Sequence, residues 1–195
     1  MTRVGRFGWL LLGFLVFAIA ERLYERRFSR QAKRGEVKML WSYAAFHILH
    51  ALIYVGTALE YFLRQRPVNG LVVVLGLILF VVSLGVRLTA IRTLGRFLSL
   101  NLEIRGDHQL VREGVYRYLR HPAYLAIMLE VISIPLVGNA WWVLALSVGG
   151  YIPLLLLRWR REEREMIAKF GAQYEEYRQQ VWAFVPWRRL ETARR

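Results

Sequence analysis

Long apolar runs separated by basic segments dominate the chain. Five runs are candidates for membrane helices, because a bilayer core needs about 20 mostly apolar residues per spanning helix. They cover Phe7–Ala20, Met39–Leu63, Leu71–Ala90, Ala123–Gly138 and Ala140–Leu157. The last two are short and meet at the turn signal Gly138-Asn139, which predicts an antiparallel hairpin. The pattern therefore predicts an all-α polytopic membrane protein with about five transmembrane helices.

The first run has two readings. Arg3 and Arg6 precede a short apolar stretch that ends in Ala18-Ile19-Ala20, a pattern also typical of a cleavable signal peptide. We expect the segment to be retained as a membrane helix. Residues 21–38, which follow it, are basic and are expected to form a helix at the membrane surface.

Charge sets the expected orientation. The chain carries 28 Lys and Arg and a net charge of +14. In a soluble domain that basicity would suggest nucleic acid, but here the charges lie between apolar runs and suggest a membrane surface. With the N-terminus outside, 24 of the 28 basic residues become cytoplasmic, which the positive-inside rule favours. Cysteine is absent, which excludes disulfides and thiol nucleophiles.

The whole chain is predicted to be one integral membrane domain. Residues 1–90 would supply three transmembrane helices. Residues 91–195 would supply the cofactor-binding and catalytic portion, including the hairpin 123–157. Within that portion, residues 91–122 form the longest loop, and loops of such length in compact proteins are usually functional. The active site is therefore expected on the cytoplasmic side.

The segment Arg120-His121-Pro122-Ala123-Tyr124 is the first candidate for chemistry. Proline is favoured at the first position of a helix, so Pro122 predicts a helix start at the cytoplasmic interface. Helix N-termini present amides and partial positive charge, which suit a carboxylate or a phosphate. The alternative is a plain helix start, with Arg120 at the headgroups and Tyr124 in the aromatic belt.

Two further segments carry charged or aromatic groups at helical spacing. In Arg158–Glu165, Arg158 and Glu162 lie four residues apart on one helical face. Surface salt bridges would explain this segment, and so would binding of a cationic ligand by Glu162 and Glu163. Tyr174 and Tyr177 share a face of a later helix, where they could pack in a core or stack on a purine.

Four ionisable residues lie inside apolar runs, where such groups are functional hypotheses by default. His47 and His50 share a helical face and are expected to form interhelical hydrogen bonds rather than a metal site. The partners of Glu60 and Glu130 do not follow from the sequence. No metal is expected.

Residues 106–187 resemble the isoprenylcysteine carboxyl methyltransferase family and related membrane phospholipid methyltransferases. The order and spacing of many pieces carry this resemblance, and the first ninety residues match only as apolar helices. The pieces are Asp107-His108-Gln109-Leu110-Val111, Gly114-Val115-Tyr116, Arg120-His121-Pro122-Ala123-Tyr124, Arg158, Glu162-Glu163, Phe170-Gly171, Tyr174, Tyr177 and Pro186.

The resemblance implies an S-adenosylmethionine site in the C-terminal half, with a lipid substrate entering from the bilayer. It implies that Arg158 and Glu162 are catalytic, with Arg158 at the acceptor. It also implies that twelve residues bind the cofactor: His108, Leu110, Val111, Gly114, Tyr116, Arg120, His121, Pro122, Tyr124, Glu163, Tyr174 and Tyr177. One departure is Ala126, where the family often has glycine, and its methyl group could narrow the lipid entrance.

The function implied is S-adenosylmethionine-dependent methyl transfer to a membrane-embedded lipid-like substrate, foremost carboxyl O-methylation of an isoprenylcysteine-type group. A carboxylate acceptor is already ionised near neutral pH and needs no general base. The expected partners are a lipid or prenylated small molecule and the bilayer, without nucleic acid. The alternatives are a phospholipid N-methyltransferase, an NADPH-dependent membrane reductase and a non-enzymatic membrane protein.

Overall fold

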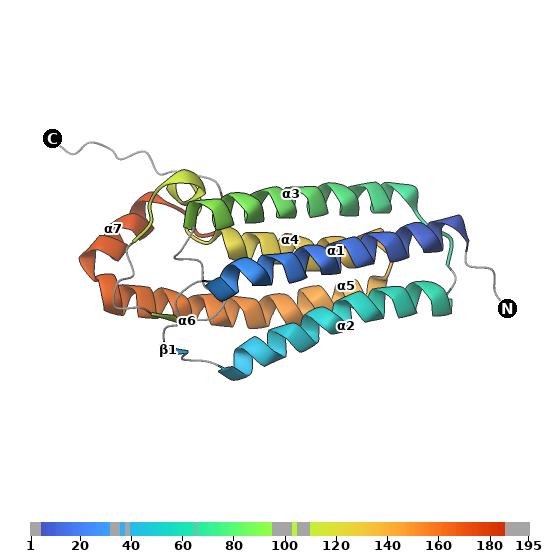
Figure 1. Cartoon of the computed structure of the whole chain (residues 1–195), viewed down its shortest axis with the longest axis horizontal. Coiled ribbons are helices and arrows are strands. Elements are labelled where there is room, and N and C mark those ends of the chain that lie inside the picture. Colours follow the sequence, from blue (N-terminus) through green and yellow to red (C-terminus); the bar gives the residue numbers. More distant parts are fainter. Residues whose placement is uncertain are drawn as a thin grey trace.

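The computed structural model describes residues 5–31, 36–37, 40–64, 66–94, 103–104 and 110–185. Long helices run side by side along the longest axis of the molecule (Figure 1). As predicted, the fold is helical, with helices long and apolar enough to span a membrane. In chain order, the elements of the first half are α1 (Arg6–Gln31), β1 (Glu36–Val37), α2 (Leu40–Arg64), α3 (Gly70–Leu94) and β2 (Glu103–Ile104).

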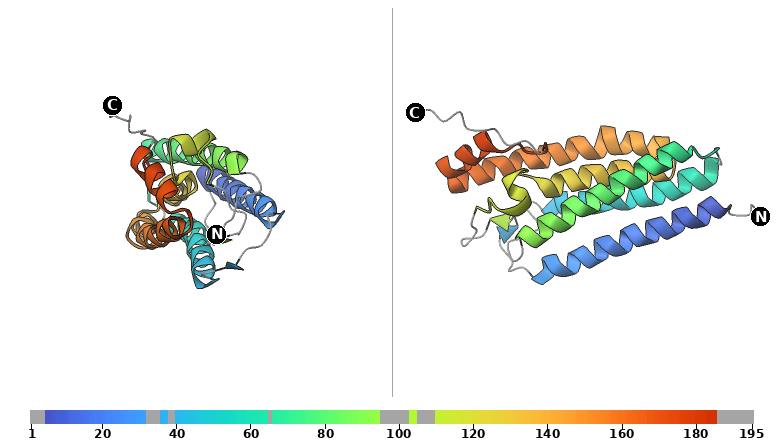
Figure 2. Two further views of the ribbon diagram at one scale, coloured as in Figure 1. Left: turned by 90° about the vertical axis from the view of Figure 1, so that its left-hand side faces the viewer. Right: turned by 90° about the horizontal axis from the view of Figure 1, so that it is seen from above.

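The second half begins with a short 3₁₀ turn and ends in a helical cap over one end of the bundle. Figure 2 shows the last helix at the same end as the start of the fourth. The elements are η2 (Gly114–Arg117), α4 (Pro122–Val137), α5 (Trp141–Leu146), the π-helical turn η3 (Ser147–Tyr151), α6 (Ile152–Phe170) and α7 (Ala172–Gln180). The two short strands pair in antiparallel fashion, with Glu36 opposite Ile104.

Within the described residues, four helical segments are long and apolar enough to cross a membrane: Arg6–Glu25, Ala45–Arg64, Gly70–Leu94 and Trp141–Phe170. The last of these runs without interruption through α5, η3 and α6. Large apolar side chains such as Leu63, Leu71 and Val81 are exposed on these helices, which suits a surface covered by lipid. The protein is therefore an integral membrane protein.

The helix α4 lies at the centre of the bundle. It has only 16 residues, and ten of them are buried. It packs chiefly on α3 through small residues: a Cβ on Gly76 would lie 2.8 Å from the backbone nitrogen of Val137. Ser83 of α3 donates to the carbonyl oxygen of Ala126 at 2.7 Å. Ala126 is fully buried, and its expected effect on a lipid entrance stays a prediction.

The turn between α4 and α5 lies at Gly138-Asn139, where the sequence signalled it. Asn139 adopts a positive φ of 51°, and its Oδ1 accepts from the amide of Asn69 at 2.9 Å. Glu60 of α2 accepts from the free amides of Trp142 and Val143 at 3.0 and 3.1 Å. Glu60 is thus the cap of the α5 N-terminus, where a carboxylate is favoured.

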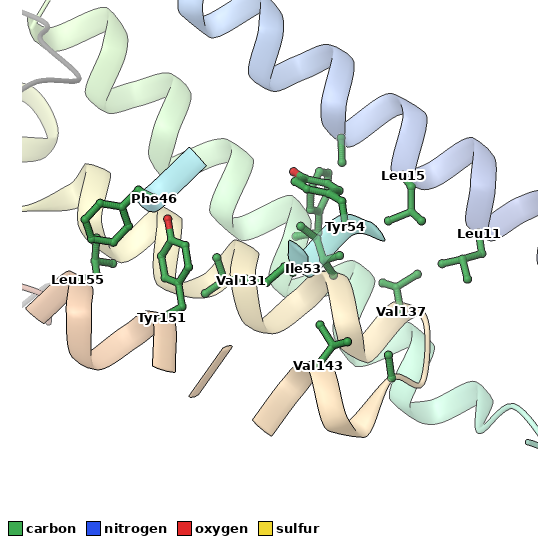
Figure 3. Packing of buried hydrophobic residues seen from close by; sticks show 14 of the residues in the cluster. Leu11, Leu15, Phe46, Ile53, Tyr54, Val131, Val137, Val143, Tyr151 and Leu155 are labelled. Carbon is green, nitrogen blue, oxygen red and sulfur yellow. The ribbon is translucent and has the colours of Figure 1, made fainter. Parts of the chain in front are cut away.

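The basic segment that follows the first apolar run does not begin a separate helix. The helix α1 continues unbroken from Arg6 to Gln31. The apolar core holds this helix through Leu11, Leu15 and Ala18, which pack with residues of α2 and α4 (Figure 3).

Candidate functional site

The segments singled out in the sequence meet where α4 begins, where α6 ends and where α7 packs across them. The backbone amides of Arg120 and His121 donate to the carbonyl oxygens of Trp182 and Ala183, both at 3.0 Å. The chain after α7 therefore runs along the entry to α4, and anion binding at this helix start stays a prediction. His121 is the N-cap residue of α4, and Pro122 follows it at the first helical position.

Glu163 is the organising residue of this region. Both of its carboxylate oxygens accept from Arg120, at 2.5 and 2.7 Å. The same carboxylate contacts His121 Nε2 at 2.5 Å, accepts from the Tyr174 hydroxyl at 2.7 Å, and lies 3.1 Å from Arg178 Nε. Because a carboxylate only accepts, His121 Nε2 must carry its proton here. One buried anion thus ties α4, α6 and α7 together.

Glu162 lies in a different environment from its neighbour. Its side chain is 32% exposed, against 9% for Glu163. It accepts a hydrogen bond from the Tyr124 hydroxyl and lies 3.8 Å from His121 Nδ1. A carboxylate offers about four lone-pair sites, so Glu162 keeps capacity for a further cationic or hydrogen-bonding partner.

Arg158 lies one helical turn before Glu162 on the same helix. Its side chain lies near the Tyr124 hydroxyl, and its guanidinium lies 5.4 Å from the ring centroid of Phe46 on α2. Arg158, Tyr124 and Glu162 therefore form one contiguous group, with a cation and an anion on either side of a phenol. This is the part of the site in which a charged reactant can be held between opposite charges.

Tyr174 and Tyr177 hold α7 in place. They are 2% and 3% exposed, and their rings meet edge to face at 6.1 Å. Tyr177 donates to the carbonyl oxygen of Tyr116, while Arg112 lies over the ring of Tyr177 at 5.5 Å. Burial raises the pKa of both hydroxyls above the ordinary value, so they act as neutral donors. Stacking of either ring on a purine stays a prediction.

The remaining predicted cofactor residues lie on the segment that leads into α4. Leu110 packs on the Tyr174 cluster, and Val111 beside it is partly buried. Gly114 has a φ of 55°, and a Cβ there would lie 2.5 Å from Thr93 Oγ1, so only glycine fits against the end of α3. Asp107, His108 and Pro186 lie outside the residues that the structure describes.

A second group of charged residues lies inside the helix bundle, and the sequence pointed to two of its members, Glu130 and His50. The carboxylate of Glu130 is fully buried. It accepts from Arg22 Nε at 2.8 Å and from the Tyr54 hydroxyl at 2.7 Å, and it also pairs with Arg87. Arg87 in turn pairs with Glu21 at 2.5 Å. We call this group the intramembrane charge cluster.

This cluster extends to α2 and to the π-helical turn. Arg22 pairs with Glu25 at 2.9 Å and lies 3.4 Å from His50 Nε2. The Tyr151 hydroxyl lies 2.6 Å from the other ring nitrogen of His50. His50 therefore makes the interhelical contacts that we expected. Arg22 follows the first apolar run and Arg87 lies inside the third, so the sequence could have marked both as candidates. Their partners could not be identified from the sequence.

Comparison with known proteins finds a family match in the part of the chain that contains this site. Residues 74–168 match the model of the isoprenylcysteine carboxyl methyltransferase (ICMT) family. This stretch contains α4, Arg158 and both glutamates. The chain is 25% identical to the uncharacterized protein YpbQ of Bacillus subtilis over 161 residues, which are 81% of this chain and 95% of that protein.

Two further relatives differ in their acceptors. Protein-S-isoprenylcysteine O-methyltransferase of Saccharomyces cerevisiae is 24% identical over 205 residues, covering 94% of this chain and 81% of that protein. Methanethiol S-methyltransferase of Mycobacterium tuberculosis is 33% identical over 73 residues, covering 37% of this chain and 29% of that protein.

A solved structure of the eukaryotic intramembrane Ras methyltransferase ICMT aligns with a TM-score of 0.49 and 25% identity. The alignment covers 75% of this chain and 50% of that one. The match over residues 74–168, just under half of the chain, and the relatives named methyltransferases show that the chain is similar to the isoprenylcysteine carboxyl methyltransferase family.

Proposed function

We propose that this protein is an S-adenosylmethionine-dependent methyltransferase that methylates the carboxylate of an isoprenylcysteine-type lipid substrate. The observation that carries the proposal is the group formed by Arg158, Tyr124 and Glu162 at one end of a membrane bundle, within the stretch that matches the family. The relative from Saccharomyces cerevisiae, which aligns over most of this chain, is named for this reaction.

The residues present fit the cofactor. S-adenosylmethionine, when bound, supplies a methyl group on a cationic sulfur. Glu162 is the partly exposed carboxylate with spare acceptor capacity, so it can lie against a positive charge. Glu163 already accepts hydrogen bonds from Arg120, His121 and Tyr174, and its role is to hold the start of α4, α6 and α7 in fixed positions around the site.

Arg158 suits the acceptor better than the donor. A guanidinium beside a sulfonium is repulsive, whereas a guanidinium beside a carboxylate is attractive and can form two parallel hydrogen bonds. Glu162 can therefore bind the cationic methyl donor, and Arg158, one turn away, can bind the anionic acceptor. The acceptor oxygen is ionised near neutral pH, so no residue needs to remove a proton. Exclusion of water between two opposite charges that become neutral products favours the transfer.

We also propose that this site faces the cytoplasm and that the N-terminus lies outside. The 24-to-4 division of basic residues supports this orientation. The end of the bundle that carries α7 holds Arg112, Arg120 and Arg178, whereas the opposite turn at Gly138-Asn139 has no basic residue. The lipid-like substrate would then reach the site from the inner leaflet.

The test is methyl transfer by the purified protein in detergent. Labelled S-adenosylmethionine is offered with an S-prenylcysteine derivative that has a free carboxylate, with the same compound as its amide, with methanethiol and with phosphatidylethanolamine. We expect label only with the free carboxylate, released by base as methanol, as an ester requires. Label on methanethiol alone would assign the thiol chemistry of the mycobacterial relative instead, and label on the phospholipid amine would overturn carboxyl transfer.

A further inference from the structure

The acceptor end of the site includes a residue from outside the stretch that matches the family. The ring of Phe46 lies under the guanidinium of Arg158 at 5.4 Å. Phe46 is on α2 and is 7% exposed, whereas the family match begins at residue 74. Phe46 thus forms one wall of the place where Arg158 would hold an anionic group.

The position of Phe46 is fixed by a π-helical turn. The ring of Tyr151 meets that of Phe46 edge to face at 5.2 Å, as Figure 3 shows. Tyr151 is 1% exposed and ends η3, the π-helical turn inside the long helix. Such turns add a residue to the helix and redirect the side chains on it, and they are frequent at functional sites. Its hydroxyl reaches His50 Nδ1 at 2.6 Å.

The hydrogen bonds of His50 determine its tautomer. Nε2 lies 3.4 Å from the guanidinium of Arg22, which only donates, so Nε2 carries the lone pair. Nδ1 therefore carries the proton, and it lies 3.2 Å from the carbonyl oxygen of Phe46 as well as near the Tyr151 hydroxyl. His50 is held neutral in this arrangement and connects the backbone at Phe46 to Arg22, which Glu130 holds in turn.

From this geometry we propose that His50 and Tyr151 are positioning residues for the acceptor and that Phe46 helps to select it. They fix the ring on which Arg158 rests, and so fix where the guanidinium meets an anionic headgroup and where the attached chain passes α2. This inference rests on the proposed function. It gives α2 a part in binding the acceptor, beside the family stretch, which holds the cofactor and also contributes Tyr151 and Arg158 to the acceptor end.

The test compares two tyrosine-to-phenylalanine variants of the same charge cluster. Tyr151→Phe removes the hydroxyl that reaches His50 but keeps the ring. Tyr54→Phe is the matched control, because it removes one buried hydroxyl from Glu130 and does not touch Phe46. Phe46→Leu removes the aromatic face under Arg158. For each variant, the KM for the S-prenylcysteine acceptor, kcat, the Kd for S-adenosylmethionine and the Tm in detergent are measured.

We expect Tyr151→Phe and Phe46→Leu to raise the KM of the acceptor about five- to tenfold, the worth of one hydrogen bond or one cation–π contact. Their Kd for S-adenosylmethionine should stay within about twofold, below the effect of one such contact. Tyr54→Phe should lower the Tm comparably and leave the acceptor KM unchanged.

Four results would overturn the inference. Equal acceptor KM values in Tyr151→Phe and Tyr54→Phe would show that the cluster only stabilises the bundle. If Phe46→Leu weakened S-adenosylmethionine binding as much as it raised the acceptor KM, Phe46 would belong to the cofactor end of the site and not to the acceptor end. A wild-type protein that methylates none of the acceptors would overturn the proposed function and this inference with it, whereas an active wild type with unaffected variants overturns the inference alone.

Discussion

Glu162 and Glu163 are neighbours in sequence, and the structure predicts opposite consequences when each is changed to glutamine. The side chain of Glu163 is 9% exposed and contacts Arg120, His121, Tyr174 and Arg178. Glutamine keeps the shape but removes the charge and puts a donor where only acceptors fit. Removing one partner of a buried ion pair costs about 3–5 kcal/mol, because it leaves the other charge uncompensated.

That loss translates into a measurable change in thermal stability. At about 2–4 °C for each kcal/mol in a chain of this size, Glu163→Gln should lower the Tm by at least ~6 °C. The start of α4 and the whole of α7 are held through this carboxylate, so cofactor affinity should fall together with stability. Thermal unfolding of the protein in detergent micelles, without ligands, measures the first effect.

Glu162→Gln should show the reverse. The side chain is 32% exposed and accepts one hydrogen bond, from Tyr124, so the free energy of unfolding should change by less than about 1 kcal/mol. Turnover should fall about 10²–10³-fold, the usual loss when a group that stabilises charge at a reacting centre is removed. If Glu162→Gln proved the less stable variant, or if Glu163→Gln unfolded at the wild-type temperature, the structural role of Glu163 and the reactant-binding role of Glu162 would be wrong.

Three further predictions follow from the same structure. Reporter fusions at the C-terminus and between α2 and α3 should give cytoplasmic and external signals, respectively; identical signals would contradict the expected orientation. Arg158→Ala should keep cofactor affinity and lose methyl transfer, and Arg158→Lys should recover little because the bidentate fork is gone; full activity of the lysine variant would contradict the acceptor role. Gly76→Ala should cost about 1–3 kcal/mol of stability because its Cβ would meet Val137, whereas Gly85→Ala on the same helix, with nothing within 4 Å, should not destabilise the fold.

Periodicity and turn chemistry made most of the fold predictable. The apolar runs predicted the helix starts to within one residue, and Gly138-Asn139 marked the turn into α5. Asn139 adopts the left-handed backbone that asparagine tolerates. The continuation of α1 to Gln31 was not predicted. A polar sequence after an apolar run signals the end of the hydrophobic span, but it does not by itself end a helix, because glutamate and arginine are good helix formers.

The sequence predicted which residues form the candidate site, but not which of the two glutamates is buried and structural and which is available to a reactant. Consecutive residues on a helix point about 100° apart, so Glu162 and Glu163 had to face different surroundings. Which of them turns inward depends on the rotation of α6, and that is set by packing elsewhere, including Leu155 in the core and Tyr174 on α7. Motif spacing contains no information on this rotation.

The intramembrane charge cluster shows the same limit more sharply. A charge inside an apolar helix needs a partner, and in a bilayer the partner must come from another helix. For Glu130 the partners lie 43 and 108 residues away, at Arg87 and Arg22. Each residue could be recognised alone, but their pairing follows from the order in which α1, α3 and α4 pack. Because the same packing brings His50 to Arg22 and Tyr151 to His50, the contacts that hold the bundle together also reach Phe46 and the acceptor end of the site.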